Sequence, residues 1–274
     1  MSWTSVRIRA PGAERDAVVA LLFELGSMGV QEDGEALVTH FPPPVDDEAL
    51  RQRVRHVSRR AVVELAGTPD VDWSVHWRDQ IVSHDLGRFV IAPPWLVCAE
   101  DAERTIVIEP GMAFGTGDHA TTRGLIRLMV NVIRGGDVVA DLGAGSAVLA
   151  IAAARLGAVR VIAIELDEDA IENAEENVVR NAVSDRVTVL QGDAELLLPL
   201  VAPVQVVLVN IISSVITHLL STIERSLALA GAMVFGGVLL AEREELSRAL
   251  RGRGWTIGAE HVEGEWWSAT AHRG

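Results

Sequence analysis

The chain has 274 residues, of which 24 are basic and 38 acidic, so its net charge at pH 7 is −14, and 49% of its residues are hydrophobic. This composition excludes a disordered or fibrous protein. The negative charge argues against direct nucleic-acid binding, because the phosphate backbone needs positive partners, and it favours a basic protein partner. At about 150 residues per domain, the length predicts two domains.

Missing residue types narrow the possible chemistry. Every basic residue is Arg, and neither Lys nor Tyr occurs, so no lysine amine or tyrosine phenol of the chain can act as base or nucleophile. The single cysteine, Cys98, cannot close an internal disulfide or build a cysteine-rich zinc site, which favours a reducing compartment. We find no signal peptide and no apolar run of about 18 residues. We therefore expect a cytoplasmic protein without membrane contact.

Residues 1–66 carry the pattern of a small α+β domain. An apolar strand pattern at 6–10 is followed by an amphipathic helix pattern at 14–26. Two short strands, a second helix and a closing strand are then predicted at 29–34, 35–41, 46–60 and 61–65. The order strand, helix, strand, strand, helix, strand is that of a ferredoxin-like sandwich.

The rest of the chain predicts a linker and an α/β domain. Residues 67–95 place Trp73 and Trp77 one helical turn apart, which favours a linker with a helix. Within residues 96–274, apolar strand patterns alternate with helical patterns, as in an open parallel sheet with helices on both faces. The last two strands join at Gly264, and such a hairpin makes the sheet mixed.

The strongest single motif is DLGAGS at residues 141–146, between an apolar strand and a helix of small residues. Gly143 and Gly145 permit a tight turn at the carboxyl edge of the sheet, where open α/β sheets bind ligands. A nicotinamide enzyme is disfavoured, because Val148 replaces the third glycine of its fingerprint and Asp141 repels pyrophosphate. A cofactor with a positive centre, such as S-adenosylmethionine, suits Asp141 better.

Two further acids follow the next strands. Glu165 ends the strand after the glycine turn, about 20 residues beyond Gly143, where nucleoside cofactors use an acid to bind ribose hydroxyls. Asp193 follows the third strand and either reaches the adenine or caps the next helix. Taken singly, the two glycines are explained by an ordinary turn and Glu165 by a solvated strand end. The spacing between the glycine turn and Glu165 favours a cofactor site.

A glycine-rich loop lies upstream, EPGMAFGTGDHATT at residues 109–122. A helix follows it, and Asp118, Thr121 or Thr122 is a possible N-cap. Capping alone leaves the three glycines, the phenylalanine and His119 of this loop unexplained, so the loop indicates a binding function. We assign His119 no catalytic role, because such a histidine is as often a structural hydrogen-bonding residue.

This loop resembles the PGxAFGTGxHxTT loop of the ribosomal protein L11 methyltransferase family. The resemblance covers roughly residues 70–272 and extends through DLGAGSAVLAIAAARLGA, IELDEDAIENAEENVVRNAV, VVLVNI, WSVHWRDQ and EGEWW. It implies a ferredoxin-like substrate-recognition domain, a linker and a seven-stranded, Rossmann-like methyltransferase domain. It also implies that the substrate is a basic ribosomal protein of the large subunit, methylated on lysine side chains and the α-amino group.

By the same resemblance, Thr122, Gly143, Glu165 and Asn210 hold S-adenosylmethionine. Asp141, Gly145 and Asp193 complete the expected cofactor site, and no metal is needed. Asn210 is also the expected catalytic residue, since a carbonyl acceptor near the methyl group orients the hydrogens of the incoming amine. The alternative is a strand-end amide that caps the next helix.

The chain departs from the family pattern at two positions of this site. Glu165 stands where the family usually has Asp, and Ala147 stands where it usually has Gly. We expect the extra methyl of Ala147 to crowd the cofactor. Two other functions stay open: an amine methyltransferase acting on another protein or a small molecule, and a binding protein whose site these changes have damaged.

Overall fold

The structure is a computed structural model and describes residues 4–27, 29–34, 36–41, 45–67, 81–110 and 117–273. Its contacts divide the chain into two compact units, Met1–Gln80 and Ile81–Gly274. The finer division into 1–66, 67–95 and 96–274 stays a prediction, because residues 68–80, including Trp73 and Trp77, lie outside the described residues.

The first unit is a four-stranded antiparallel sheet with two α-helices. Its elements are β1 (Thr4–Arg9), α1 (Arg15–Glu24), β2 (Val30–Asp33), β3 (Ala36–Phe41), α2 (Asp47–Val57) and β4 (Val62–Gly67). The strand order is β2-β3-β1-β4. Asp46 caps α2 by accepting a hydrogen bond from the Ala49 amide at 3.0 Å. Val6, Ile8, Leu22, Leu37 and Val54 pack between sheet and helices, so both helices bury their apolar faces against this sheet.

The second unit contains a seven-stranded mixed sheet. Its strands are β8 (Val138–Leu142), β9 (Arg160–Glu165), β10 (Val187–Gln191), β11 (Val204–Asn210), β12 (Leu227–Leu239), β13 (Trp255–Glu263) and β14 (Trp266–Arg273). Their order is β10-β9-β8-β11-β12-β14-β13, and β14 runs antiparallel to both of its neighbours. The predicted hairpin turning at Gly264 and the mixed sheet are therefore confirmed.

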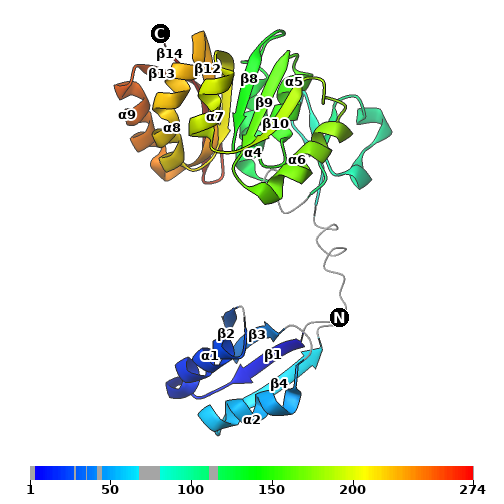
Figure 1. Cartoon of the computed structure of the whole chain (residues 1–274), viewed down its shortest axis with the longest axis vertical. Helices are drawn as coiled ribbons and strands as arrows, with labels where there is room; N and C mark the ends of the chain where they lie inside the picture. Colours follow the sequence, from blue (N-terminus) through cyan, green and yellow to red (C-terminus); the bar gives the residue numbers. More distant parts are fainter. Residues whose placement is uncertain are drawn as a thin grey trace. The chain divides into compact units, whose positions relative to one another are not determined.

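Helices lie on both faces of this sheet (Figure 1). They are α4 (Ala120–Met129), α5 (Val148–Arg155), α6 (Glu168–Arg180), α7 (Ala194–Val201), α8 (Ser213–Ser226) and α9 (Arg243–Gly252). Because alternate strand residues face opposite sides, Val139 packs in the core with α4, α5 and α6, while its neighbour Ala140 packs with α7, α8 and α9. This two-sided core makes the strands apolar throughout.

A second, three-stranded sheet lies within the predicted linker range and beyond it. It consists of β5 (His84–Asp85), β6 (Val90–Ala92) and β7 (Thr105–Val107), in the order β5-β6-β7. The side chains of Asn177 on α6 and of Asn181, the residue that follows α6, accept hydrogen bonds from the Glu109 and Val107 amides at 2.8 and 2.9 Å. Residues 81–95 thus belong to the second unit, an association that no local pattern indicates.

Helix α8 (Ser213–Ser226) ends earlier than the helical sequence pattern around it. The helical pattern at 213–230 includes Leu227 to Ala230, but α8 ends at Ser226 and β12 begins at Leu227. Leu227 pairs with Val204 of β11, so a strand partner replaces the helical hydrogen bonds. No helix in the described part of the chain has the length and apolar character needed to cross a membrane.

Candidate functional site

Three strands bring the predicted site residues to one edge of the seven-stranded sheet. Leu142 pairs with Ile164 on one side and with Val209 on the other. Asp141, Glu165 and Asn210 lie within one residue of these pairs, at the carboxyl ends of parallel strands. The edge is the position at which open α/β sheets bind ligands.

The turn after β8 has the backbone that its glycines predict. Gly143 has φ +70° and Gly145 has φ +51°, a left-handed conformation that other residues adopt with strain. The amides of Gly143 and Ala144 both donate to the carbonyl oxygen of Ile164, at 2.9 and 3.1 Å. A Cβ atom at Gly143 would come within 2.8 Å of Ile211, so the turn approaches the end of β11 closely.

Glu165 folds back onto this turn. One carboxylate oxygen accepts the Gly145 amide at 2.8 Å, and the other accepts the amides of Leu166 and Asp167 at 2.8 and 2.9 Å. The methylene by which Glu exceeds Asp gives the carboxylate the reach for this contact. Carboxylate oxygens accept more than one hydrogen bond each, so the predicted binding of ribose hydroxyls stays possible and stays a prediction.

Asp141 is fully buried at the end of β8. Its Oδ2 accepts the Ala150 amide at 3.0 Å, and its Oδ1 has no hydrogen-bond partner among the described residues. Ala147, the N-cap residue of α5, offers no side-chain acceptor, so Asp141 caps the helix from the strand. Burial raises the pKa of Asp141 to about 7, the Ala150 hydrogen bond opposes this shift, and the charge of Glu165 adds to it.

Ala147 has the left-handed conformation, with φ +64°, that explains why glycine is usual at this position. The residue is completely buried and belongs to the core beneath α4, α5 and α6. The expectation that its methyl crowds the cofactor stays a prediction. What the structure adds is backbone strain at this position.

Thr122 and Asn210 meet across the site. Thr122 lies in the first turn of α4 and is fully buried, and its Oγ1 is 3.4 Å from Nδ2 of Asn210. Because Nδ2 donates to Thr122, the carbonyl Oδ1 of Asn210 is the free acceptor; it is buried and lacks a partner in the described chain. Gly236 pairs with Asn210, and a Cβ at Gly236 would overlap Leu125 and lie 3.5 Å from Asn210 Oδ1, so α4 packs closely on the strands here.

Asp193 has the capping role that was one of its two predicted roles. It is the N-cap of α7 and accepts the Glu195 amide at 2.8 Å. Its contact with adenine stays a prediction. At α4, the cap is His119 and none of the three predicted residues: its Nδ1 lies 3.4 Å from the Thr121 amide. Burial and the charge of Arg123 lower the pKa of His119.

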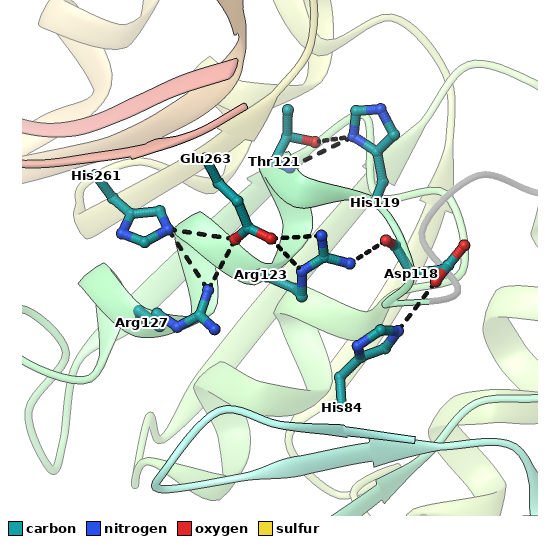
Figure 2. A network of polar contacts seen from close by, with 8 residues as sticks. All are labelled: His84, Asp118, His119, Thr121, Arg123, Arg127, His261 and Glu263. Atoms are coloured by element: carbon teal, nitrogen blue, oxygen red, sulfur yellow. Dashed lines mark hydrogen bonds and ion pairs between the residues drawn. The ribbon is translucent and has the colours of Figure 1, made fainter. Parts of the chain in front are cut away.

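A polar network beside this edge is not among the features predicted from the sequence (Figure 2). Glu263, at the end of β13, accepts hydrogen bonds from Arg123 and Arg127 of α4. Arg123 also donates to the main-chain oxygen of Asp118, whose carboxylate lies 3.0 Å from Nε2 of His84. The available signal was the i, i+4 spacing of the two arginines, but their acidic partner is 140 residues from Arg123.

No group of three or more His, Cys, Asp or Glu residues in the described ranges is arranged to hold a metal ion. The candidate site consists of backbone amides, the carboxylates of Asp141, Glu165 and Asp193, the Thr122 hydroxyl and the Asn210 side-chain amide. Such groups can bind a small polar cofactor and orient an amine, and they supply no strong base of their own.

Comparisons with known proteins identify the family of the chain. The family described as Ribosomal protein L11 methyltransferase (PrmA) matches residues 48–274. The ribosomal protein L11 methyltransferase of Desulforamulus reducens is 31% identical, over 97% of each chain, and that of Thermus thermophilus is 34% identical, over 92% of each. The crystal structure of ribosomal protein L11 methylase from Lactobacillus delbrueckii subsp. bulgaricus has a TM-score of 0.64 and 26% identity, covering 70% of this chain and 99% of that one. The chain therefore belongs to the ribosomal protein L11 methyltransferase (PrmA) family, and it is a methyltransferase.

Proposed function

We propose that this enzyme transfers methyl groups from S-adenosylmethionine to lysine side chains and the α-amino group of ribosomal protein L11. The observation that carries the proposal is the carbonyl oxygen of Asn210, a buried acceptor without a partner in the described residues, at the edge where the glycine turn lies. Family membership supports the reaction and the substrate.

The residues at the edge fit S-adenosylmethionine. Asp141 Oδ1 is a buried, unpartnered oxygen that suits a cationic group, and the open turn at Gly143 and Gly145 leaves backbone close to a ligand. Glu165 would hold the ribose, Asp193 would lie near the adenine, and Thr122 and Asn210 would border the methyl group. The cofactor supplies a methyl group activated on a sulfonium, which needs no metal ion.

The residues of this chain mainly align the reactants. The amine must reach the site neutral, with its proton lost to water, because only its free lone pair can take the methyl group that S-adenosylmethionine would supply. Asn210 Oδ1 accepts a hydrogen bond from the remaining N–H groups and thereby directs the nitrogen lone pair. Thr122 holds the other end of the amide. Because the chain has no Lys or Tyr, neither can be the base.

The first unit supports a role in substrate recognition. Its strand and helix order, with the sheet order β2-β3-β1-β4, is compatible with a ferredoxin-like sandwich, and we assign residues 1–66 this role. Of the predicted linker, 67–95, residues 81–95 belong to the second unit, so we place the start of the methyltransferase domain at Ile81 and not at residue 96. The net charge of −14 suits a basic substrate and speaks against direct contact with nucleic acid. We place the reaction in the cytoplasm, where ribosomal proteins are made.

Intact-mass spectrometry of purified L11, incubated with the enzyme and S-adenosylmethionine, tests the proposal. We expect stepwise methyl additions, and a loss of rate of about a hundredfold in Asn210→Ala, because one oriented acceptor near the reacting atoms contributes about this much. The free energy of unfolding should change by less than about 1 kcal/mol, since the side chain makes one long hydrogen bond.

The same experiment, combined with a calorimetric titration of the cofactor, separates the alternatives. Cofactor binding in a calorimetric titration without methylation of L11 would keep an amine methyltransferase and discard this substrate. Absence of saturable cofactor binding would indicate a binding protein with a damaged site. Unchanged turnover in Asn210→Ala would remove Asn210 from the mechanism.

A further inference from the structure

We propose that Arg123 and Glu263 are positioning residues that hold Thr122 in the place where it orients the amide of Asn210. The inference rests on the proposed role of Asn210 in methyl transfer. The polar network of Figure 2 would then support the site through Thr122.

Helix α4 is held to the β13–β14 hairpin by charged hydrogen bonds. Nε and Nη2 of Arg123 donate to one oxygen of Glu263 at 3.0 and 2.6 Å, and Arg127 donates to the other oxygen at 3.1 Å. Arg123 is only 17% exposed and Glu263 34%. The hydrogen bond from Arg123 lowers the pKa of Glu263 to about 2, so the carboxylate stays ionised at neutral pH.

Arg123 also contacts the segment that precedes α4. The same Arg123 guanidinium donates from Nη1 to the main-chain oxygen of Asp118. His84 of β5 holds the Asp118 carboxylate at 3.0 Å. Figure 2 shows that Arg123 lies between Glu263 and Asp118. One guanidinium therefore joins the helix, the preceding segment and the hairpin.

Helix α4 packs closely on the seven-stranded sheet. A Cβ at Gly124 would come within 2.8 Å of Ser268 Oγ, and one at Gly236 would overlap Leu125, so the helix cannot move nearer the sheet. Its remaining freedom is to slide or rotate on the sheet surface. The contacts of Arg123 with Glu263 and Asp118 oppose this motion at the first turn, next to Thr122.

The orientation of the Asn210 side-chain amide is sensitive to sliding or rotation of α4. The distance from Thr122 Oγ1 to Asn210 Nδ2, 3.4 Å, is near the upper limit for a hydrogen bond, so a shift of a few tenths of an ångström breaks it. Without this bond, the Asn210 side chain has no hydrogen-bond partner among the described residues that fixes its orientation. The amine would then meet Nδ2 in part of the molecules, and a donor cannot accept its hydrogens.

The chain offers a matched control in Glu224 and Arg253. They form a similar two-bond pair, at 2.8 and 2.8 Å, between α8 and the segment after α9. This pair makes no contact with Thr122, Asn210 or Asp118 among the described residues. A general loss of stability should therefore affect Glu224→Gln and Glu263→Gln alike, while a positioning effect should affect Glu263→Gln alone.

The test is a double-mutant cycle on kcat for L11 methylation. We expect Glu263→Gln to lower kcat about tenfold, within the range caused by small misplacements, with the KM for S-adenosylmethionine changed less than twofold. In a Thr122→Val background, Glu263→Gln should lower kcat no further, because the contact it supports is already absent. An additive loss, an equal loss in Glu224→Gln, or an unchanged kcat would overturn the proposal.

A second measurement does not depend on activity. The side-chain amide signals of Asn210 in ¹⁵N NMR spectra, identified by their absence in Asn210→Ala, should shift in Glu263→Gln and stay in place in Glu224→Gln. If L11 proves not to be a substrate, the proposed function fails while this measurement still decides the positioning role. Unshifted Asn210 signals in folded Glu263→Gln would refute it.

Discussion

The buried carboxyl of Asp141 predicts an unusual dependence of stability on pH, which Asp141→Asn should remove. In the folded chain burial raises the pKa of Asp141 from 3.8 to about 7. Between these values the folded state keeps a proton that the unfolded state has lost. The free energy of unfolding therefore falls as the pH rises through this range, and the fall ends above about pH 7.

The size of the effect follows from the pKa shift. One pH unit in which only the folded state holds the proton corresponds to about 1.4 kcal/mol. Between pH 5 and pH 8, Asp141 alone should lower the free energy of unfolding by about 3 kcal/mol, an upper value because buried sites relax. The amide that replaces the carboxyl in Asp141→Asn does not titrate, so this part of the pH dependence should disappear in the variant.

Chemical denaturation at several pH values measures this difference. Four of the seven tryptophans lie in the second unit, so intrinsic fluorescence reports mainly on the unit that contains Asp141; they are Trp95, Trp255, Trp266 and Trp267. Other titrating groups are present in both proteins and cancel when the two pH profiles are subtracted. Parallel profiles of wild type and Asp141→Asn would refute the assignment of a neutral, buried carboxyl.

Two substitutions test the close packing and the strain near the site. Gly236→Ala should destabilise the protein by about 1–3 kcal/mol, because the new Cβ would overlap Leu125. The control, Gly252→Ala at the end of α9, meets nothing within 4 Å and should stabilise the protein slightly. Equal denaturation midpoints in the two variants would contradict this packing. Ala147→Gly should change the free energy of unfolding by less than about 1 kcal/mol, because relief of the left-handed backbone strain offsets the loss of the buried methyl group. Ala152→Gly, inside α5, relieves no such strain and should lower the free energy of unfolding by about 2 kcal/mol. Equal losses in these two variants would show that the strain is absent.

Local patterns determined much of the second unit. The alternation of apolar strands with amphipathic helices predicts the open sheet, and the turn at Gly264 predicts its antiparallel edge. The ends of parallel strands share one edge, so the grouping of Asp141, Glu165 and Asn210 follows once the strands are recognised. These features depend on residues close in sequence, whose periodicity is visible without a structure.

The tertiary structure decided which atoms of these residues are available. Thr122 and Asn210 are 88 residues apart, and their contact leaves Oδ1 as the free acceptor. Asp141 caps α5, and its pKa rises to about 7 because the strand and the helix bury it together. Arg123 and Glu263 meet only because α4 packs on the hairpin. These hydrogen-bond partners and this burial depend on residues distant in sequence, so they cannot be predicted from local periodicity.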